Sequence, residues 1–338
     1  MVALIGTFTG FGTLVVLFLG GLHVIEGRMT LGDFVAFNAY FALLAWPTIA
    51  LGWIVNVFQR ASGAMDRVDE ILRVEPRVPA PGETVGPPLD GSIRLHELSF
   101  AYSAAQDAPV LSGISLAIPA GSKIAIVGAV GAGKSTLAHL IARVYPVPRG
   151  TLFFGDDDAT QIPVERVRAG VALVPQEAFL FSRTLRDNVR LARPSASEID
   201  ITRAVATSRL DADLSAFPAG LDTVVGERGY TLSGGQRQRA TLARALLTEA
   251  PILVLDDALS AVDAGTEQEI LDGLERERRG RTLILVTHRY AALKSMDRIV
   301  VLEHGRLVED GPHDDLIARD GAYARLYRRR RLEDRVSQ

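Results

Sequence analysis

Apolar residues are concentrated at the start of this chain, in two long stretches that carry no charged side chain. The stretches cover residues 2–22 and 34–58. As α-helices rising about 1.5 Å per residue, each would be roughly 30 Å long or more, enough to cross the hydrocarbon core of a bilayer. A short polar turn with Glu26, Arg28 and Asp33 separates them. Because a backbone in lipid must satisfy its own hydrogen bonds, the pattern predicts two membrane-spanning helices, at about 2–25 and 34–58.

Two other structures for this hairpin fit the pattern less well. A cleaved signal peptide would begin with a basic segment and would not be followed by a second apolar stretch of similar length. A buried hairpin of a soluble protein would use shorter apolar helices. Arg60, Arg67 and Arg73 come after the second stretch. By the positive-inside rule, the turn is therefore expected outside and everything after residue 58 in the cytoplasm.

Beyond the second stretch, the pattern changes to an amphipathic helix and then to a proline-rich segment. Ala64, Val68 and Ile71 recur at helical spacing, and this helix is expected to end before Pro76. Residues 76–88 are rich in proline and glycine, which is typical of a linker. The expected organisation is a transmembrane hairpin with a cytoplasmic helical extension at 1–75, a linker at 76–90, a cytoplasmic domain at 91–331 and a C-terminal tail at 332–338.

Composition narrows the function classes only slightly. The net charge is −3, which gives no sign of a nucleic-acid partner. The chain has no cysteine, so disulfides and thiolate metal sites are excluded, in keeping with a reducing compartment. The chemistry therefore has to come from local motifs.

A glycine-rich loop, GAVGAGKST at 128–136, follows a short apolar run with β character at 123–127. An apolar pattern with helical spacing begins at Leu137. Strand, glycine loop and helix are the context of a phosphate-binding loop, in which backbone N–H groups and the helix N-terminus face the phosphates. Lys134 is expected to reach the β- and γ-phosphates, and the Ser135 hydroxyl to contact Mg²⁺.

A second apolar run, ILVL at 252–255, leads directly into Asp256. A carboxylate at the carboxyl end of a buried strand is well placed to bind magnesium, directly or through water. Such a run followed by aspartate is common by itself. Downstream of a phosphate-binding loop, it predicts the magnesium ligand of a nucleotide site.

The order of these and several further motifs resembles the nucleotide-binding domain of an ABC transporter. Along the chain the motifs are Tyr102, GAVGAGKST at 128–136, Gln176, LSGGQ at 232–236, ILVLDD at 252–257, SAVD at 260–263 and His288. The preceding hairpin resembles the last two membrane helices of an exporter-type half-transporter. The resemblance covers essentially the whole chain, and LSGGQ is nearly diagnostic. It implies an α/β P-loop NTPase fold of the ABC type, a mixed sheet with flanking helices and a helical subdomain, preceded by an α-helical transmembrane hairpin.

The resemblance also implies an activity, cofactors and partners. The expected protein is a multi-pass ATPase of the cytoplasmic membrane that uses ATP and Mg²⁺ to export a substrate. ATP binding would close two nucleotide-binding domains on each other, and hydrolysis and phosphate release would reopen them. The expected partners are a second half-transporter subunit and the lipid bilayer, with no nucleic acid. The motifs do not specify the transported substrate.

Individual roles follow from the same resemblance. Tyr102 matches the aromatic residue that stacks on adenine, Gln176 the glutamine that contacts Mg²⁺ and the attacking water, and His288 the switch histidine at the γ-phosphate. Ser233 begins the motif that contacts ATP held by the opposite subunit, and Asp263 matches the D-loop residue that spans the interface. The expected nucleotide-binding residues are Tyr102, Gly128, Gly131, Gly133, Lys134, Ser135, Thr136, Ser233, Gly234, Gly235, Gln236 and Asp263; the catalytic residues are Gln176, Asp257 and His288; the metal ligands are Ser135, Gln176 and Asp256.

The chain departs from the family pattern at Asp257, where most active members have glutamate as the carboxylate that polarises the attacking water. Aspartate withdraws the carboxylate by roughly 1–1.5 Å, and a misplacement of about 1 Å can cost on the order of a hundredfold in rate. We therefore expect weak hydrolysis at this chain's own site, with ATP binding retained. This combination resembles one subunit of a heterodimeric exporter, which is favoured over a homodimer in which a bridging water lets Asp257 serve.

A second departure is the number of membrane helices, because an exporter half normally has six before its nucleotide-binding domain and two are predicted here. We expect that the chain is part of a longer protein or that another polypeptide supplies the rest. Two other functions stay open. One is a regulatory ATP-binding subunit that completes a partner's active site, and the other is a membrane-anchored ABC ATPase that does not transport.

Overall fold

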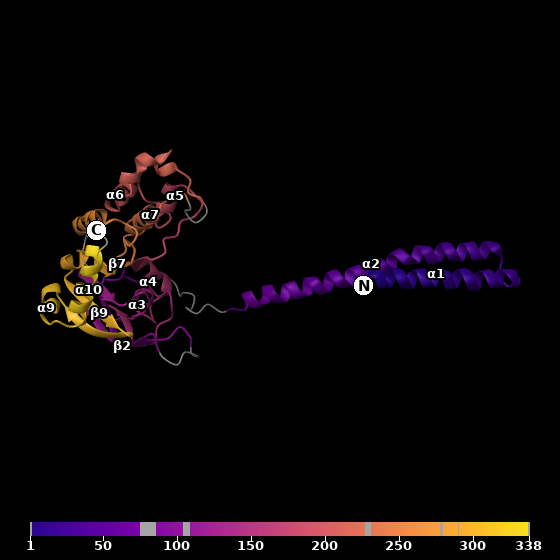
Figure 1. The fold of residues 1–338 in the computed structure, drawn as a ribbon, viewed down its shortest axis with the longest axis horizontal. Helices are drawn as coiled ribbons and strands as arrows, with labels where there is room; N and C mark the ends of the chain where they lie inside the picture. The colour runs from indigo at the N-terminus through magenta and orange to yellow at the C-terminus, as the bar shows by residue number, and fades with distance from the viewer. Residues whose placement is uncertain are drawn as a thin grey trace. The chain divides into compact units, whose positions relative to one another are not determined.

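The computed structural model describes residues 2–74, 86–103, 109–226, 231–277, 280–289 and 291–336. Contacts divide the chain into two units, Met1–Pro76 and Arg77–Gln338 (Figure 1). The predicted linker at 76–90 lies largely outside the described residues, which resume at Gly86.

Unit 1 is a helical hairpin. Helix α1 covers Val2–Ile25 and helix α2 covers Leu31–Leu72, so one continuous helix includes both the second apolar stretch and its amphipathic extension. Thr30 caps α2: its hydroxyl accepts a hydrogen bond from the Asp33 amide at 3.1 Å, and the Asp33 carboxylate accepts one from the Thr30 amide at 3.4 Å. This reciprocal cap satisfies donors that the first helical turn leaves open. Pro47 lies inside α2 without ending it, as membrane helices tolerate.

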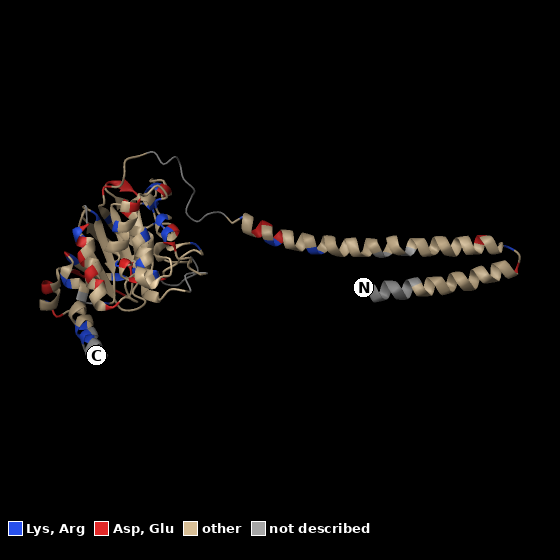
Figure 2. Ribbon diagram, turned by 90° about the horizontal axis from the view of Figure 1, so that it is seen from above, with Lys and Arg blue, Asp and Glu red and all other residues tan. Residues whose placement is uncertain are grey.

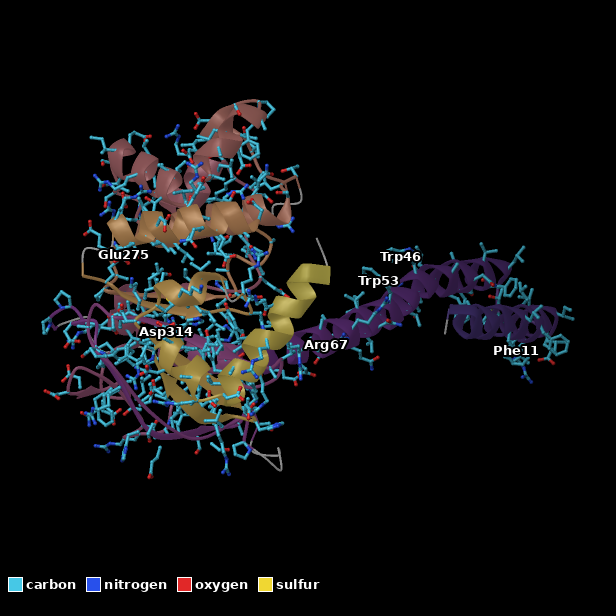
Figure 3. All side chains as sticks on the ribbon, turned by 60° about the vertical axis from the view of Figure 1, so that its left-hand side comes forward. Phe11, Trp46, Trp53, Arg67, Glu275 and Asp314 are labelled. Carbon is cyan, nitrogen blue, oxygen red and sulfur yellow. The ribbon has the colours of Figure 1, made fainter. Side chains whose placement is uncertain are left out.

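The two helices approach closely where a glycine of α1 faces a ring of α2. A Cβ at Gly20 would lie 2.6 Å from the Phe34 ring, so a larger residue there would require this ring to move. Elsewhere large apolar side chains are exposed, with Trp46 77% and Trp53 66% exposed (Figure 3). Among the described residues, α2 is the one helix long and apolar enough to cross a membrane, and α1 adds the shorter apolar segment Gly10–Ile25. Helices that are apolar on all sides are suited to lipid.

Charge is distributed unevenly along this hairpin. Figure 2 shows charged residues at the turn between α1 and α2 and again toward the end of α2, with a long uncharged length between them. In the sequence this uncharged length is 34–59, and Arg60 is the first charge after it. A charged side chain at the bilayer centre costs about 2.5–3.5 kcal/mol, so the uncharged length is the part suited to hydrocarbon.

Unit 2 contains two β-sheets. The larger has the strand order β10-β9-β3-β8-β7-β6, in which β10 is antiparallel to β9 and all other neighbours are parallel. The smaller is antiparallel, with the order β2-β1-β4-β5. The strands are β1 (Ile93–Phe100), β2 (Leu111–Ile118), β3 (Lys123–Gly128), β4 (Leu152–Phe154), β5 (Asp157–Asp158), β6 (Val171–Val174), β7 (Ile252–Asp256), β8 (Thr282–Val286), β9 (Arg298–Glu303) and β10 (Arg306–Gly311).

Helices cover the larger sheet and build a separate subdomain. They are α3 (Lys134–Ile141), α4 (Val164–Gly170), α5 (Leu185–Arg190), α6 (Glu198–Thr207), α7 (Gly234–Leu246), α8 (Ala264–Arg276), α9 (His313–Ala318) and α10 (Ala322–Val336), with short 3-10 turns η1 (Asp211–Ala216), η2 (Gly220–Asp222) and η4 (Ala291–Ser295). Residues 332–336, expected as part of a tail, continue α10.

Three apolar clusters hold unit 2 together. One lies between the smaller sheet, α3 and one face of the larger sheet, and a second lies on the opposite face under α8 and α10. Strands β7 and β8 are buried along their whole length, because both faces of this parallel sheet are covered. The third cluster lies within α5, α6 and α7. The mixed sheet, flanking helices and helical subdomain expected from the sequence are confirmed.

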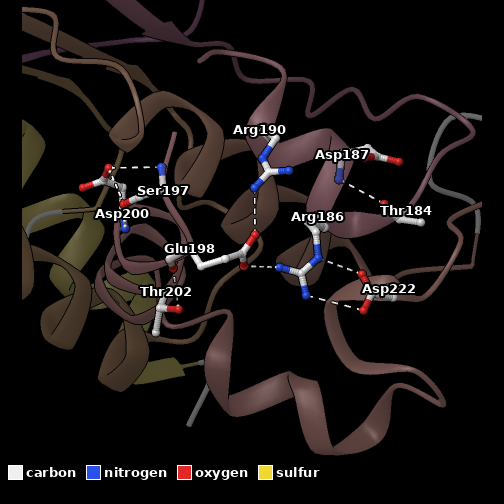
Figure 4. A network of polar contacts seen from close by, with 9 residues as sticks. All are labelled: Thr184, Arg186, Asp187, Arg190, Ser197, Glu198, Asp200, Thr202 and Asp222. Carbon is white, nitrogen blue, oxygen red and sulfur yellow. Dashed lines mark hydrogen bonds and ion pairs between the residues drawn. The ribbon is translucent and has the colours of Figure 1, made fainter. Parts of the chain in front are cut away.

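An ion-pair network joins α5, α6 and η2 within the helical subdomain (Figure 4). Arg186 on α5 donates to the Asp222 carboxylate at 2.7 Å and also to Glu198 on α6. Arg190, one turn further along α5, donates to the other oxygen of Glu198 at 2.7 Å. Helix α7 packs against both α5 and α6, so the network and α7 belong to the same subdomain.

Candidate active site

The predicted catalytic residues follow neighbouring strands of the larger sheet. The phosphate-binding loop follows β3, His288 follows β8, Asp257 follows β7 and Gln176 follows β6. These four strands are adjacent and parallel, so their carboxyl ends meet at one edge of the sheet. Such an edge is where open α/β sheets bind ligands.

The phosphate-binding loop depends on glycines where the backbone is crowded. A Cβ at Gly128 would lie 2.2 Å from the Leu302 carbonyl oxygen, at the end of β9. Gly133 has φ 95°, and a Cβ there would lie 2.6 Å from the Leu111 side chain. A side chain at either position would displace the loop, so the glycines keep its backbone N–H groups available for an anion.

Lys134 is folded back over this loop. Its ammonium donates to the carbonyl oxygens of Gly128 at 3.0 Å and Ala129 at 2.8 Å. Burial lowers the pKa of Lys134, while the nearby carboxylates of Asp257 and Asp256 oppose that shift. A desolvated ammonium that donates to two carbonyls fits the anionic phosphates of a nucleotide.

Ser135 and Asp256 form a pair of oxygen ligands. The Ser135 hydroxyl donates to Asp256 Oδ1 at 3.0 Å, and the His139 imidazole lies 3.8 Å from Oδ2. Asp256 is 1% exposed, and burial raises its pKa, with Ser135 and His139 working against that shift. Among the described residues no group of three or more His, Cys, Asp or Glu could hold a metal alone. A hydroxyl and one carboxylate fit magnesium that takes its remaining ligands from water and phosphate.

Asp257 adopts a left-handed backbone with φ 48°. Its amide donates to the Val286 carbonyl at 2.9 Å, and the Gln176 side-chain amide donates to Asp257 Oδ2 at 3.5 Å. Burial raises the pKa of Asp257, and the positive charges of His288 and Arg289 are the largest opposing influences. The structure thus brings the three predicted catalytic residues, Gln176, Asp257 and His288, together beside the phosphate-binding loop.

Tyr102 lies at the rim of this loop. Its hydroxyl is 2.8 Å from Thr136 Oγ1, within hydrogen-bonding distance. Its ring meets the rings of Phe100 and Tyr145 edge-on, with centroids 5.2 and 5.1 Å away. The ring is therefore part of an aromatic cluster. Tyr145, which belongs to this cluster, was not among the predicted site residues. His139 was also missed, although its spacing of four residues from Ser135 places both on one face of α3.

The LSGGQ motif builds the start of α7. Ser233 is exposed and caps the helix, since its hydroxyl accepts from the Gln236 amide at 3.2 Å while Gln236 Oε1 accepts from the Ser233 amide at 3.0 Å. The Gln236 amide group also donates to Asp213 Oδ1 at 3.3 Å, so this predicted nucleotide ligand is engaged within the chain. A Cβ at Gly235 would lie 2.9 Å from the Ala261 carbonyl oxygen.

The predicted residues thus form two sets. One surrounds the phosphate-binding loop, and the other is the start of α7 with the neighbouring D-loop, residues 260–263. Asp263 caps α8 by accepting from the Thr266 amide at 2.9 Å, and this bond lowers the pKa of Asp263. Ser233 and Gly234 present an exposed hydroxyl and a helix N-terminus, which suits an anion brought by another molecule.

Comparison with known proteins agrees with this geometry. Residues 111–260 match the ABC transporter family model. The probable multidrug resistance ABC transporter ATP-binding/permease protein YheI of Bacillus subtilis (strain 168) is 38% identical over 313 residues, which cover 93% of this chain and 53% of that protein. An ATP-dependent lipid A-core flippase of Syntrophus aciditrophicus (strain SB) is 38% identical over 330 residues, covering 97% and 54%.

A solved structure is similar over almost the whole chain. A bacterial Atm1-family ABC exporter with ATP bound matches with a TM-score of 0.82 and 33% identity, covering 97% of this chain and 58% of that one. The chain spans about half the length of the curated relatives it matches. The relatives agree with the predicted location in the cytoplasmic membrane, with the nucleotide-binding domain in the cytoplasm, and the matched domain implies ATP binding. This chain belongs to the ABC transporter family, and its fold is that of the exporter type.

Proposed function

We propose that this chain is an ATP-binding and ATP-hydrolysing subunit of an exporter, which couples nucleotide-driven dimerisation to transport of a substrate across the cytoplasmic membrane. The observation that carries this proposal is the gathering of Gln176, Asp257 and His288 beside a phosphate-binding loop, in a chain that begins with an apolar hairpin. The names of the relatives, which include multidrug and lipid transporters, leave the substrate open.

When ATP binds, contacts within the phosphate-binding loop would be replaced by contacts to the phosphates. Lys134 would release the carbonyls of Gly128 and Ala129 and donate to phosphate oxygens, which suit its charge better than carbonyl dipoles do. Mg²⁺ held by Ser135 and Asp256, with Gln176 nearby, would neutralise negative charge on the phosphates.

Hydrolysis needs a positioned water more than covalent chemistry by the protein. Among the residues that the structure describes, Asp257 is the carboxylate placed to accept a hydrogen bond from that water. The Gln176 amide donates to its Oδ2. Asp257 acts as a base only when ionised, so His288 and Arg289 assist it by opposing the rise in its pKa that burial causes. His288 would donate to the γ-phosphate.

The shorter side chain of Asp257 supports unequal halves. We infer that this chain retains ATP but hydrolyses it weakly, and that its Ser233 and Gly234 complete the site of a different partner subunit. A heterodimer is therefore favoured over a homodimer.

The test replaces Asp257 by glutamate in the complex purified with its natural partner. Asp257→Glu should raise hydrolysis at this chain's own site on the order of tenfold to a hundredfold, because it restores reach to the attacking water, and the turnover of the complex should rise above that of wild type. Adding Lys134→Ala to the same chain should remove the gain, which locates it at this chain's own site. Turnover no faster than wild type would contradict the weak-site proposal, and purification of a partner identical to this chain would contradict the heterodimer.

A regulatory ATP-binding subunit is the second candidate, and Asp257 is the observation that favours it. In that case nucleotide at this chain's own loop only holds the dimer together. The complex would then keep its turnover when the chain's own site cannot hydrolyse, and Asp257→Glu would still produce a gain of function.

A further inference from the structure

Arg289, the residue after the switch histidine, is bound into the D-loop. Its guanidinium donates to the carbonyl oxygen of Ser260 at 2.7 Å and also to that of Val262. A third bond, of 2.8 Å, joins it to Glu267 Oε2 on α8. One side chain therefore ties the end of β8 to both arms of the D-loop and to the helix that follows it.

Glu267 makes this attachment costly to break. The residue is 3% exposed, and burial raises the pKa of its carboxyl group while the hydrogen bond from Arg289 works in the opposite direction. Removing Arg289 would leave the buried charge of Glu267 uncompensated, which is strongly unfavourable. Arg289 and Glu267 are thus each held by the other.

The opposite side of the D-loop is attached to α7. The Ala261 amide donates to Gln238 Oε1 at 2.8 Å, and the Gln238 amide group donates to the Ser260 hydroxyl at 3.0 Å. Gly235 packs against Ala261 so closely that a Cβ would lie 2.9 Å from its carbonyl oxygen. The D-loop therefore lies between Arg289 on one side and the first turn of α7 on the other.

We propose that Arg289 is a positioning residue that couples the two nucleotide surfaces of this chain. It fixes the D-loop to the end of β8, where His288 faces the chain's own ATP. Through Ala261 and Gln238 it also sets where Ser233 lies for the partner's ATP. The inference rests on the proposed function, because it assigns the residue that aligns the two halves of that ATPase.

The bonding pattern matches a positioning role better than a purely stabilising one. Arg298 provides the comparison, since it makes a two-bond ion pair with Asp310 and a further 2.8 Å bond to the Ala117 carbonyl. That arginine joins β9, β10 and β2, away from the described site residues. Arg289 instead reaches two carbonyls within the motif that contacts α7.

The activity test compares Arg289→Lys with Arg298→Lys in the full chain assembled with its partner. Lysine keeps the charge, but its three donors sit on one nitrogen and cannot reproduce the planar fork whose two terminal nitrogens reach the three acceptors. Arg289→Lys should lower kcat about tenfold or more while the KM for ATP changes less than about twofold, because alignment is lost and binding is not. Arg298→Lys should leave both nearly unchanged. Equal kcat in the two variants would overturn the proposal. So would a rise in the KM for ATP of Arg289→Lys as large as its fall in kcat.

A second readout does not depend on turnover. Hydrogen exchange at the Ala261 amide, measured without nucleotide, should be at least about fivefold faster in Arg289→Lys than in wild type or Arg298→Lys. If Arg289→Lys fails to fold, Glu267→Gln takes its place, because it keeps the shape of the partner side chain. Exchange at the Ala261 amide should then also be faster than in wild type, by a smaller factor. Unchanged exchange in every variant would overturn the inference. If the wild-type complex hydrolyses no ATP, the proposed function fails, and the exchange measurement still decides the role of Arg289.

Discussion

Asp256 and Asp257 stand side by side at the end of β7, and both have a pKa raised by burial. Asp256 is the more enclosed, at 1% exposure, and its hydrogen bond from Ser135 and the nearby His139 only partly offset the burial. Without a cation, an ionised Asp256 therefore costs stability in the nucleotide-free protein, as is common at functional sites.

Asp256→Asn should therefore stabilise the nucleotide-free protein by about 0.5–2 kcal/mol at neutral pH while abolishing magnesium-dependent ATP binding. A carboxyl group with a raised folded pKa contributes stability when protonated and loses it as pH rises through that pKa. The gain from asparagine should thus be present at neutral pH and disappear as pH falls toward the ordinary aspartate value of about 3.9.

Thermal unfolding of both proteins across pH, with and without Mg²⁺ and ATP, measures this. A melting temperature of Asp256→Asn below that of wild type at neutral pH, without ligand, would contradict it.

At the scale of elements, a carboxylate from a strand caps the start of α10. Glu309 on β10 accepts from the backbone amides of Ala322 at 2.5 Å and Tyr323 at 3.0 Å, which are the first residues of α10. Gly321 makes room for it, since a Cβ there would lie 1.8 Å from Glu309 Oε1. Tyr323 is fully buried under the larger sheet, so the cap and the packing of α10 depend on each other.

Glu309→Ala should destabilise the nucleotide-binding unit by about 1–2 kcal/mol, because two helix donors lose their acceptor. Glu309→Gln retains one acceptor oxygen and should lose less. Urea unfolding followed by circular dichroism compares the midpoints. If alanine and wild type unfold at the same urea concentration, the cap does not contribute as described.

At the scale of the whole molecule, one chain carries two nucleotide-binding surfaces that are expected to differ in how much they contribute to ATP hydrolysis. The surface at the phosphate-binding loop ends in the short carboxylate of Asp257, whereas the exposed start of α7 has its full motif at 232–236. Under the proposed function, the second surface serves the partner. Damage to it should then affect the complex more than damage to the chain's own loop.

Ser233→Asp tests this without removing the helix cap, because aspartate caps as well as serine and adds a negative charge that repels phosphate. In the complex it should lower turnover about tenfold or more, whereas Lys134→Ala should abolish ATP binding at the chain's own site and lower turnover less. Steady-state ATPase rates and the number of bound nucleotides per complex measure the two effects. A larger loss of turnover from Lys134→Ala than from Ser233→Asp would contradict the proposal that the start of α7 matters more to turnover than the chain's own loop.

Local patterns predicted the parts of this molecule that are contiguous in sequence. The strand, loop and helix around Lys134 and the acid at the end of β7 occupy the predicted places, because each is specified by neighbouring residues. The attachments of Arg289 to the D-loop and of Gln236 to Asp213 were not predicted. Their partners lie more than twenty residues away, and only the folded chain selects them among many possible acceptors. The antiparallel pairing of β1 with β4 was missed for the same reason.

The position of β3 in the larger sheet has a consequence for synthesis. This strand pairs with β9 on one side and β8 on the other, and Lys123 bonds to Asp297 across 174 positions of sequence. At about 5–20 residues per second, the ribosome needs roughly 10–35 s to make that interval. For most of this time the strand that bears the phosphate-binding loop has neither neighbour, since β8 begins only at Thr282, and it exposes apolar residues. The nascent chain is therefore expected to depend on holding chaperones until residue 303 has left the ribosome, long after its hairpin has met the membrane.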